Sequence, residues 1–288
     1  MKILVLGING MLGHATMDIL SKEKEWEIHG TYRDKKKINY LNINNFKNTH
    51  HIDIENINDL FKLFKKHSFE VVINCTGIVK QVLHSNSNIS IININALFPH
   101  KLEALCREFG SRIIHPSTDC VFSGQKGFYK ETDNPDSFEF YGMTKYLGEI
   151  KYGNSVTLRT SFFGHQIKDK YSLLEWFLSQ EKECFGYKNS FFSGLTTIEV
   201  ARVIKNYVIP NKNLKGLFHL GSSPISKLNL LKLIAKTYKK NINIKEDETS
   251  KINRTLNSDL FVKKTGYKPP EWSLLIENMY QYYLENYV

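Results

Sequence analysis

The sequence predicts an α/β protein: a doubly wound parallel sheet of about seven strands, followed by a smaller C-terminal α/β lobe. Two observations support this fold class. Short apolar segments of strand length alternate with helical segments through residue 161, as in parallel sheets that carry helices on both faces. Beyond that point the alternation loosens. We therefore expect one domain over residues 1–161 and a lobe over residues 162–288, with some later segments returning to the first domain.

The first strand ends in a glycine turn. Residues 2–7 are apolar, and three glycines spaced three apart then open a helix that runs to about Leu20. Glycines allow a tight turn and a close backbone approach to a pyrophosphate, and the helix N-terminus offers free amides to phosphate. The spacing differs from the commoner Gly-x-Gly-x-x-Gly, but its place after the first strand predicts a Rossmann-type dinucleotide site. Its residues are Gly7, Asn9, Gly10, Met11, Leu12 and Gly13.

The second strand, residues 27–32, ends beside a basic segment that contains Arg33 and Lys35, Lys36 and Lys37. An acidic residue at such a strand end binds the ribose hydroxyls of NAD, whereas an arginine suits the additional phosphate of NADP. Arg33 therefore predicts NADPH as the cofactor, with NADH less favoured. A solvated basic loop is the alternative, and the neighbouring Asp34 weakens the distinction.

The next strands also end near the expected cofactor. Residues 51–54 close a third strand, a helix follows through Phe64, and residues 71–77 form a fourth strand that ends in small side chains. Bulky side chains there would collide with a cofactor. The segment from residue 92 to 109 is predicted to be one long helix containing Asn95, an active-site or structural asparagine. Further cofactor contacts are expected from Asp53, Ile54, Cys75, Thr76 and Gly77.

The fifth strand and the helix after it carry the candidate chemistry. Residues 112–118 end in Ser-Thr, which places hydroxyls at the ligand-facing edge of a parallel sheet. In the following helix, a spacing of four stacks Tyr141 and Lys145 on one face, about 6 Å apart between Cβ atoms. The ammonium is expected to lower the pKa of the phenol, so that Tyr141 could exchange a proton at neutral pH. Such a pair also occurs by chance in surface helices.

Later elements are predicted from apolar periodicity and helix caps. They are a strand at residues 155–161, a helix at 173–178, a helix from Thr196 to Val208 opened by a Thr-Thr-Ile-Glu capping box, a strand at 217–220, a helix from Ser226 to Tyr238, and a terminal helix from Trp272.

Composition excludes several classes of protein. Hydrophobic residues make up 41% and charged residues 24% of the 288, and no apolar run is long enough to span a bilayer. We expect a cytoplasmic protein without a membrane partner. The four cysteines lie far apart, which argues against disulfides and a structural zinc site, and no metal site is predicted. The net charge of +10 comes from scattered lysines without a nucleic-acid-binding motif, so no nucleic acid is expected.

These motifs together resemble one family. Ser-Thr-Asp-Cys-Val-Phe-Ser-Gly at 117–124, Tyr-Gly-Met-Thr-Lys-Tyr-Leu-Gly-Glu at 141–149, Leu-Arg-Thr-Ser at 158–161 and Arg-Thr-Leu-Asn-Ser at 254–258 are similar to the extended short-chain dehydrogenases/reductases, and within them to the dTDP-4-dehydrorhamnose reductase branch. The resemblance extends from residue 1 to about 285.

The resemblance implies an NADPH-dependent reductase of the 4-keto group of a nucleotide-linked 6-deoxy sugar, in the synthesis of surface polysaccharide or O-antigen precursors. Thr118 would bind the keto oxygen, Tyr141 would protonate it, and Lys145 would hold the nicotinamide ribose. A homodimer is possible, and a UDP-linked N-acetylamino sugar is one candidate substrate. The substrate residues carried over by the resemblance are Cys120, Val121, Phe122, Gly194, Thr196 and Arg254.

Cys120 departs from the family pattern, in which tyrosine is usual, and leaves alternatives open. A 4,6-dehydratase needs an acidic pair after the threonine, which Cys120 does not supply. An epimerase-reductase resembling GDP-fucose synthase has a cysteine at the corresponding distance, and His165 is then the nearest candidate for the second proton-transfer group. A non-catalytic NADP-binding subunit, such as the methionine adenosyltransferase β subunit, is the remaining alternative.

Overall fold

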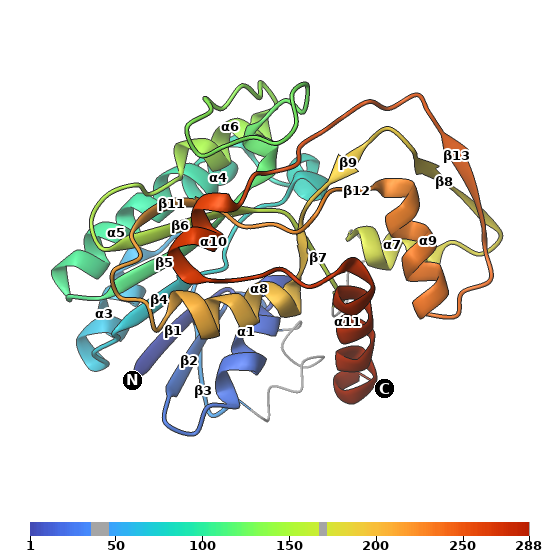
Figure 1. Cartoon of the computed structure of the whole chain (residues 1–288). Coiled ribbons are helices and arrows are strands. Elements are labelled where there is room, and N and C mark those ends of the chain that lie inside the picture. The colour runs from blue at the N-terminus through green and yellow to red at the C-terminus, as the bar shows by residue number, and fades with distance from the viewer. Residues whose placement is uncertain (36–45, 167–171, 288) are drawn as a thin grey trace.

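The computed structural model describes residues 1–35, 46–166 and 172–287, so Lys36 and Lys37 of the basic segment lie outside the described residues. A parallel sheet of seven strands forms its centre, as predicted, in the order β11-β6-β5-β4-β1-β2-β3 (Figure 1). The strands are β1 (Lys2–Leu6), β2 (Glu27–Tyr32), β3 (Asn48–His51), β4 (Val71–Asn74), β5 (Arg112–Thr118), β6 (Ser155–Thr160) and β11 (Gly216–His219).

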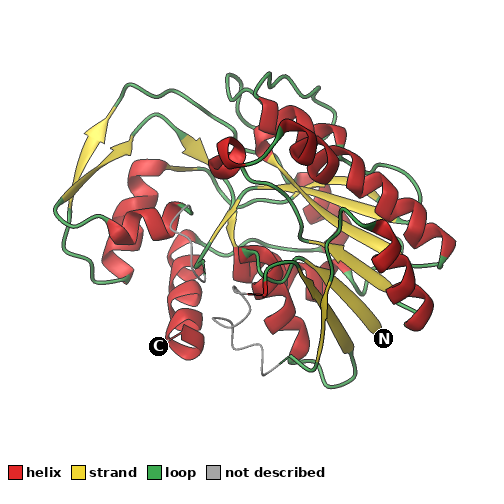
Figure 2. Cartoon of the chain, turned by 180° about the vertical axis from the view of Figure 1, so that it is seen from behind, coloured by secondary structure: helices red, strands yellow, loops and turns green. Residues whose placement is uncertain are grey.

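Helices cover both faces of this sheet (Figure 2). One face carries α1 (Met11–Ser21) and α8 (Thr197–Val203), and side chains such as Val5 and Met17 belong to the largest apolar cluster. The other face carries α3 (Ile57–Lys66) and α5 (Phe98–Glu108), which bury a second cluster that includes Leu4. Burial on both sides explains why the central strands are continuous apolar runs instead of alternating ones.

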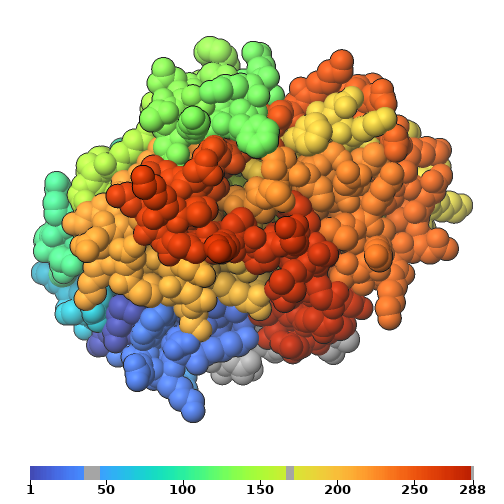
Figure 3. Space-filling view, in the orientation of Figure 1, coloured from blue at the N-terminus to red at the C-terminus, as the bar shows by residue number. Residues whose placement is uncertain are grey.

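The chain beyond β6 forms a lobe beside the carboxyl ends of the strands, at the right of Figure 1. Three pairs of short strands build it: β7 (Phe162–Phe163) with β10 (Leu195–Thr196), β9 (Phe191–Phe192) with β12 (Ile225–Ser226), and β8 (Glu183–Tyr187) with β13 (Asn243–Asp247). Its helices are α7 (Leu173–Ser179), α9 (Lys227–Thr237) and α11 (Trp272–Tyr287). In the space-filling view the orange and red segments form the front of the molecule, against the blue N-terminal segments (Figure 3).

The later chain also returns to the central sheet. Strand β11 pairs in parallel with β6, and α10 (Asp259–Thr265) packs on it. The expected caps are present: Thr196 accepts a hydrogen bond from the Glu199 amide and Ser226 from the Asn229 amide. Both helices therefore begin at a residue whose side chain satisfies an otherwise free donor.

Two predicted elements differ from the structure. Strand β3 ends at His51, two residues before Asp53. The predicted single helix over 92–109 is α4 (Asn88–Ile92), a π-helical turn η3 (Asn93–Leu97) and α5. Inside that turn, the buried amide of Asn95 accepts a hydrogen bond from the Ile78 backbone N–H (2.8 Å) and donates one to the Ile78 carbonyl (2.9 Å). A widened turn at this place matches the frequent use of π-bulges to aim one side chain.

The remaining helical segments are η2 (Lys80–Ser85), η4 (Asp119–Val121), α6 (Phe140–Leu147) and η5 (Ile204–Val208). Among the described helices, none combines the length and the apolar character needed to cross a bilayer.

Candidate active site

A cavity of about 570 Å³ lies where the carboxyl ends of the central strands meet the lobe. Parallel α/β sheets bind ligands at this edge. The cavity is lined both by residues of the glycine turn and by the candidate catalytic residues, so the fold brings the two groups together. The predicted residues that line it are Gly7, Asn9, Gly10, Met11, Leu12, Arg33, Ile54, Cys75, Thr76, Gly77, Thr118, Cys120 and Tyr141.

The glycine-turn end of the cavity fits a phosphate group. Helix α1 has no side-chain cap at Gly10 and no acidic residue in its first turn, so its free amides and dipole are open to an anion. Within the described chain, Asn9 Oδ1 is buried without a hydrogen-bond partner. Gly13 is not in the lining, but a Cβ there would lie 2.1 Å from the Gly7 carbonyl oxygen. Gly13 therefore lets the helix pack directly on the turn.

Several predicted site residues lie outside the cavity lining. Asp53 is exposed, and its carboxylate accepts a hydrogen bond from the Glu55 amide, so the structure does not place it in an adenine pocket. Val121 and Phe122 are buried in a separate apolar cluster with Tyr129. Neither Val121 nor Phe122 lines the cavity, and their buried side chains support the site from behind. The other predicted residues outside the lining are Lys145, Gly194, Thr196 and Arg254.

Helix α6 brings Tyr141 against the end of β5. A Cβ at Gly142 would lie 2.2 Å from the Cys120 carbonyl oxygen, so only glycine allows the helix this close. Thr118, the last residue of β5, accepts a hydrogen bond from the Cys120 amide (3.1 Å), which orients its hydroxyl. Thr118 and Tyr141 thereby line the same cavity, with hydrogen bonding between their side chains.

The prediction that the pKa of Tyr141 is lowered is wrong. Burial raises the pKa of Tyr141 above its ordinary value, Cys120 and Asp119 raise it further, and hydrogen bonding with Thr118 opposes them only in part. Removal from water disfavours the charged phenolate and is the largest of these effects. Tyr141 is therefore a neutral phenol at pH 7, the form that can donate a proton.

Lys145 lies beneath the cavity wall. Its Nζ donates a hydrogen bond to the Pro116 carbonyl oxygen (3.2 Å), and the residue is buried. Burial lowers the pKa of Lys145 to about 8, although the Glu149 carboxylate acts in the opposite direction. The amine is thus mostly protonated at pH 7 and close to the point at which it loses its charge.

A buried ion pair supports this region and was not assigned a role from the sequence. Arg159 on β6 donates two hydrogen bonds to Glu149, from Nε to Oε1 (2.6 Å) and from Nη2 to Oε2 (2.7 Å). Ser117 donates to the same carboxylate (3.0 Å), and Lys151 lies 3.5 Å from it. The pair thus connects Arg159 on β6 with Glu149 after α6, and Glu149 in turn binds Ser117, the residue before Thr118 on β5.

Cys120 lies beside a cation that comes from a distant part of the chain. Arg254 Nη1 is 3.6 Å from the Cys120 sulfur, its Nε donates to the Phe122 carbonyl (2.8 Å), and its Nη2 pairs with Glu139 (3.3 Å). Burial nevertheless raises the pKa of Cys120 to about 12, and the Asp119 carboxylate adds to this shift. The thiol is therefore protonated at pH 7 and is a poor base.

Lys227 is a cavity residue that sequence reasoning missed. It is the first residue of α9, lines the cavity, and holds its Nζ 4.0 Å from the centre of the Phe192 ring. Burial lowers its pKa, while Asp119 acts to raise it. The only sequence signal was the Ser226 cap, which fixes where the helix begins but says nothing of what its first side chain faces.

His165 is not placed to act on a substrate. One ring nitrogen lies 2.8 Å from Glu175, the other lies 2.8 Å from the Tyr238 hydroxyl, and the ring stacks on Tyr283. His165 does not line the cavity. It joins α7, α9 and α11 instead, which removes it as the partner that epimerisation would need.

A glycine turn after the first strand, a threonine at the end of β5, and a tyrosine and a lysine four residues apart on α6 define the extended short-chain dehydrogenase/reductase class. The family model described as the RmlD substrate binding domain matches residues 1–284, so the chain belongs to that family.

Two individual proteins are also similar to the chain. The chain is 30% identical over 147 residues to the "probable low-salt glycan biosynthesis reductase Agl14" of Haloferax volcanii, a match that covers 50% of this chain and 46% of that protein. It is 25% identical to the methionine adenosyltransferase 2 subunit beta of Danio rerio, over 76% of this chain and 68% of that one. The chain thus spans about half the length of the first of these relatives and two thirds of the second.

Among solved structures, a dTDP-4-dehydrorhamnose reductase from Bacillus anthracis in complex with NADP superposes with a TM-score of 0.79. The two share 20% sequence identity, and the match covers 98% of this chain and 99% of the other. At this identity the likeness shows a common fold over the whole chain.

The buried pair gives a testable prediction of stability. Glu149→Gln should lower the free energy of unfolding by about 3–5 kcal/mol, because the Arg159 charge stays buried without its partner. Chemical denaturation followed by circular dichroism measures the change. Glu108→Gln, an exposed carboxylate at the end of α5, is the matched control and should change stability by less than about 0.5 kcal/mol. Equal stability of the two variants would contradict the assignment.

Proposed function

We propose that the chain reduces the 4-keto group of a nucleotide-linked 6-deoxy sugar, with NADPH as the reductant, in the synthesis of glycan precursors. One observation carries the proposal: Thr118 and Tyr141 line the same cavity as the glycine turn, with Lys145 buried directly behind them. A bound dihydronicotinamide supplies the hydride. The chain's own side chains must then hold the ketone and deliver one proton.

The pKa directions suit the reductive reaction. A ketone oxygen that gains electron density needs a proton donor, and Tyr141 is a neutral phenol at pH 7 because burial raises its pKa. Thr118 would donate a hydrogen bond to the same oxygen. The phenolate left behind needs a positive charge nearby, and Lys145 is mostly protonated below its pKa of about 8. Turnover in this direction should therefore fall as the pH rises above 8.

Two cations support binding of the nucleotide diphosphate. Lys227 lines the cavity, and Arg254 lies beside Cys120 and pairs with the exposed carboxylate of Glu139. An arginine fork is well suited to two phosphate oxygens. The name of the Haloferax relative, a glycan biosynthesis reductase, supports a glycan precursor as the substrate. A UDP-linked N-acetylamino sugar is the leading alternative to a dTDP-linked sugar.

Tyr141→Phe should reduce turnover about a hundredfold or more, because only the proton donor is lost. Cofactor affinity, measured by fluorescence titration with NADPH, should change little. Tyr146→Phe on the exposed side of the same helix is the control and should retain full activity. Near-normal NADPH oxidation by Tyr141→Phe with a panel of 4-keto sugars on dTDP, UDP and GDP would contradict the catalytic role.

Arg33 should decide the choice of cofactor. It lines the cavity and its side chain is exposed, as expected for a group that meets the 2′-phosphate of NADPH. Loss of a charged hydrogen bond costs about 1.5–3 kcal/mol, so Arg33→Ala should weaken NADPH roughly ten- to a hundredfold and leave NADH unchanged. Lys35→Ala, two residues away and outside the lining, is the control. Equal losses for both cofactors would contradict this role.

A non-catalytic NADP-binding subunit has one observation in its favour, the similarity to the methionine adenosyltransferase β subunit. The presence of Thr118, Tyr141 and Lys145 in one arrangement favours an enzyme. NADPH consumption with a 4-keto nucleotide sugar distinguishes the two functions, since a binding subunit would take up the cofactor without oxidising it.

We expect the reaction to be a simple reduction of the ketone, without epimerisation at the neighbouring carbons. Epimerisation next to a ketone needs a base on one face of the sugar and an acid on the other; Cys120 is a protonated thiol, and His165 is held by Glu175 and Tyr238. Turnover in heavy water should give a product without carbon-bound deuterium next to the former ketone, as measured by mass spectrometry. Cys120→Ser should still turn over. Deuterium at the flanking carbons would overturn simple reduction.

A further inference from the structure

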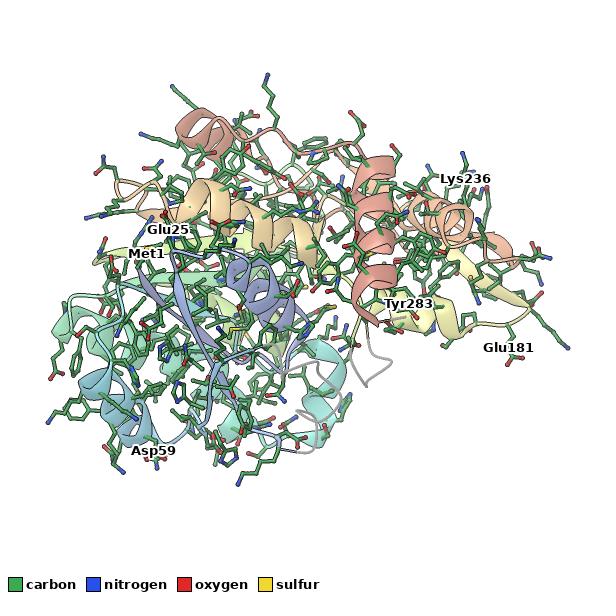
Figure 4. All side chains as sticks on the ribbon, turned by 90° about the horizontal axis from the view of Figure 1, so that it is seen from below. Met1, Glu25, Asp59, Glu181, Lys236 and Tyr283 are labelled. Carbon is green, nitrogen blue, oxygen red and sulfur yellow. The ribbon has the colours of Figure 1, made fainter. Side chains whose placement is uncertain are left out.

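Three histidines from separate elements converge on the α3 face of the sheet. His29 lies on β2, His50 on β3, and His67 is the residue at the end of α3. One ring nitrogen of each lies within 4.8 Å of the other two. None of the three lines the cavity. In Figure 4, α3 with its labelled Asp59 lies on the opposite side of the molecule from α11 with its labelled Tyr283.

The hydrogen bonds of His29 fix which nitrogen faces the cluster. Its Nε2 lies 2.9 Å from the Glu27 carboxylate, which can only accept, so Nε2 carries the proton. Nδ1 is then left with a lone pair, and it lies 2.9 Å from Nε2 of His50. A carboxylate that orients a histidine in this way is the usual support of a metal-binding imidazole.

His67 contributes a buried ring nitrogen that is available to a ligand. Within the described chain its Nε2 is buried and lacks a hydrogen-bond partner, which costs free energy unless a ligand satisfies it. The His67 ring centre is 4.5 Å from that of His29 and 5.8 Å from that of His50. The unsatisfied atom thus belongs to the same cluster as the hydrogen-bonded pair.

The surroundings of His50 and His67 disfavour the charged imidazolium. Burial lowers the pKa of His50 to about 4 and also lowers the pKa of His67, and the neighbouring histidines and Lys66 act in the same direction. Lys2 further lowers the pKa of His67, whereas Glu27 raises it. Neutral imidazole is the form of histidine that binds a metal ion.

We propose that His29 Nδ1, His50 Nε2 and His67 Nε2 bind one divalent transition-metal ion, and that this ion is zinc. Two nitrogens bound to one tetrahedral zinc lie about 3.4 Å apart, so the 2.9 Å pair must open slightly and the longer separations must close by side-chain rotation. Three imidazoles select zinc or its neighbours over magnesium and calcium, which prefer oxygen. Water completes the fourth position.

The ion would stabilise the position of an edge strand, β3. Among the described strands, β3 pairs only with β2, and the residues after it, Ile52 and Ile54, line the cavity. A metal that joins β2, β3 and α3 holds that edge in register from the face opposite α1. Its effect on stability should therefore be measurable without any turnover assay.

The test uses the full untagged chain, stripped with a chelator and then dialysed against zinc. Wild type should retain one zinc per chain by mass spectrometry of metals, and saturating zinc should raise Tm by several degrees. His50→Gln and His67→Gln should each lose this zinc and the rise in Tm. His51→Gln, the adjacent histidine on the same strand, whose ring contacts the Arg33 carbonyl instead, is the matched control and should keep both.

Cobalt provides a measurement on the wild type alone, in case a variant fails to fold. One equivalent of Co²⁺ should give the intense visible absorption of a four- or five-coordinate ion, and zinc should abolish it. A wild type that retains no zinc, or a weak octahedral cobalt spectrum, would overturn the proposal. Retention of the zinc by both His50→Gln and His67→Gln would do the same.

Discussion

The active-site side of the molecule depends on the ion pair between Arg159 and Glu149. Arg159 is fully buried, and the two hydrogen bonds of its fork compensate for the loss of water around both charges. The guanidinium also lies 5.1 Å from the Phe122 ring, and Glu149 also accepts from Ser117. One pair therefore fixes β5, β6 and the end of α6 relative to one another. Those three elements carry Thr118, Tyr141 and Lys145, so the positions of the catalytic groups follow from a pair that does not touch the cavity.

Burial decides the chemistry of the groups that this frame positions. The phenol of Tyr141 and the thiol of Cys120 are both kept neutral by removal from water, although Arg254 lies close to the sulfur. The same effect lowers the pKa of Lys145 towards neutrality. A site with a neutral phenol and a protonated amine is suited to giving a proton to a substrate oxygen. It is unsuited to removing one from carbon, and this difference separates reduction from epimerisation.

Much of the fold and part of the site could be predicted because the information is local. The glycine turn, the strand ends at Thr118 and the four-residue spacing of Tyr141 and Lys145 each lie within one short segment, and the parallel sheet brings such segments to one edge. Lys227 and Glu149 could not be assigned in this way, because their roles come from contacts with residues far away in the chain. The π-helical turn was missed for a related reason. The turn presents Asn95, which accepts a hydrogen bond from the Ile78 N–H and donates one to the Ile78 carbonyl, and no helical periodicity encodes these contacts.

The histidine cluster is the strongest case of such convergence. His29, His50 and His67 are spaced 21 and 17 residues apart, far from any short metal-binding motif, and the cysteine spacing argued against a metal. The strand register brings His29 and His50 together. In the parallel pair, His29 is opposite Asn48 and Thr31 is opposite His50. Because side chains two residues apart on a strand share a face, both histidines point to the face that α3 covers. The end of α3 then adds the third ring. An edge strand has few contacts that fix its register. The contacts of His50 with His29 and with His67 at the end of α3 fix the register of β3 without the apolar core.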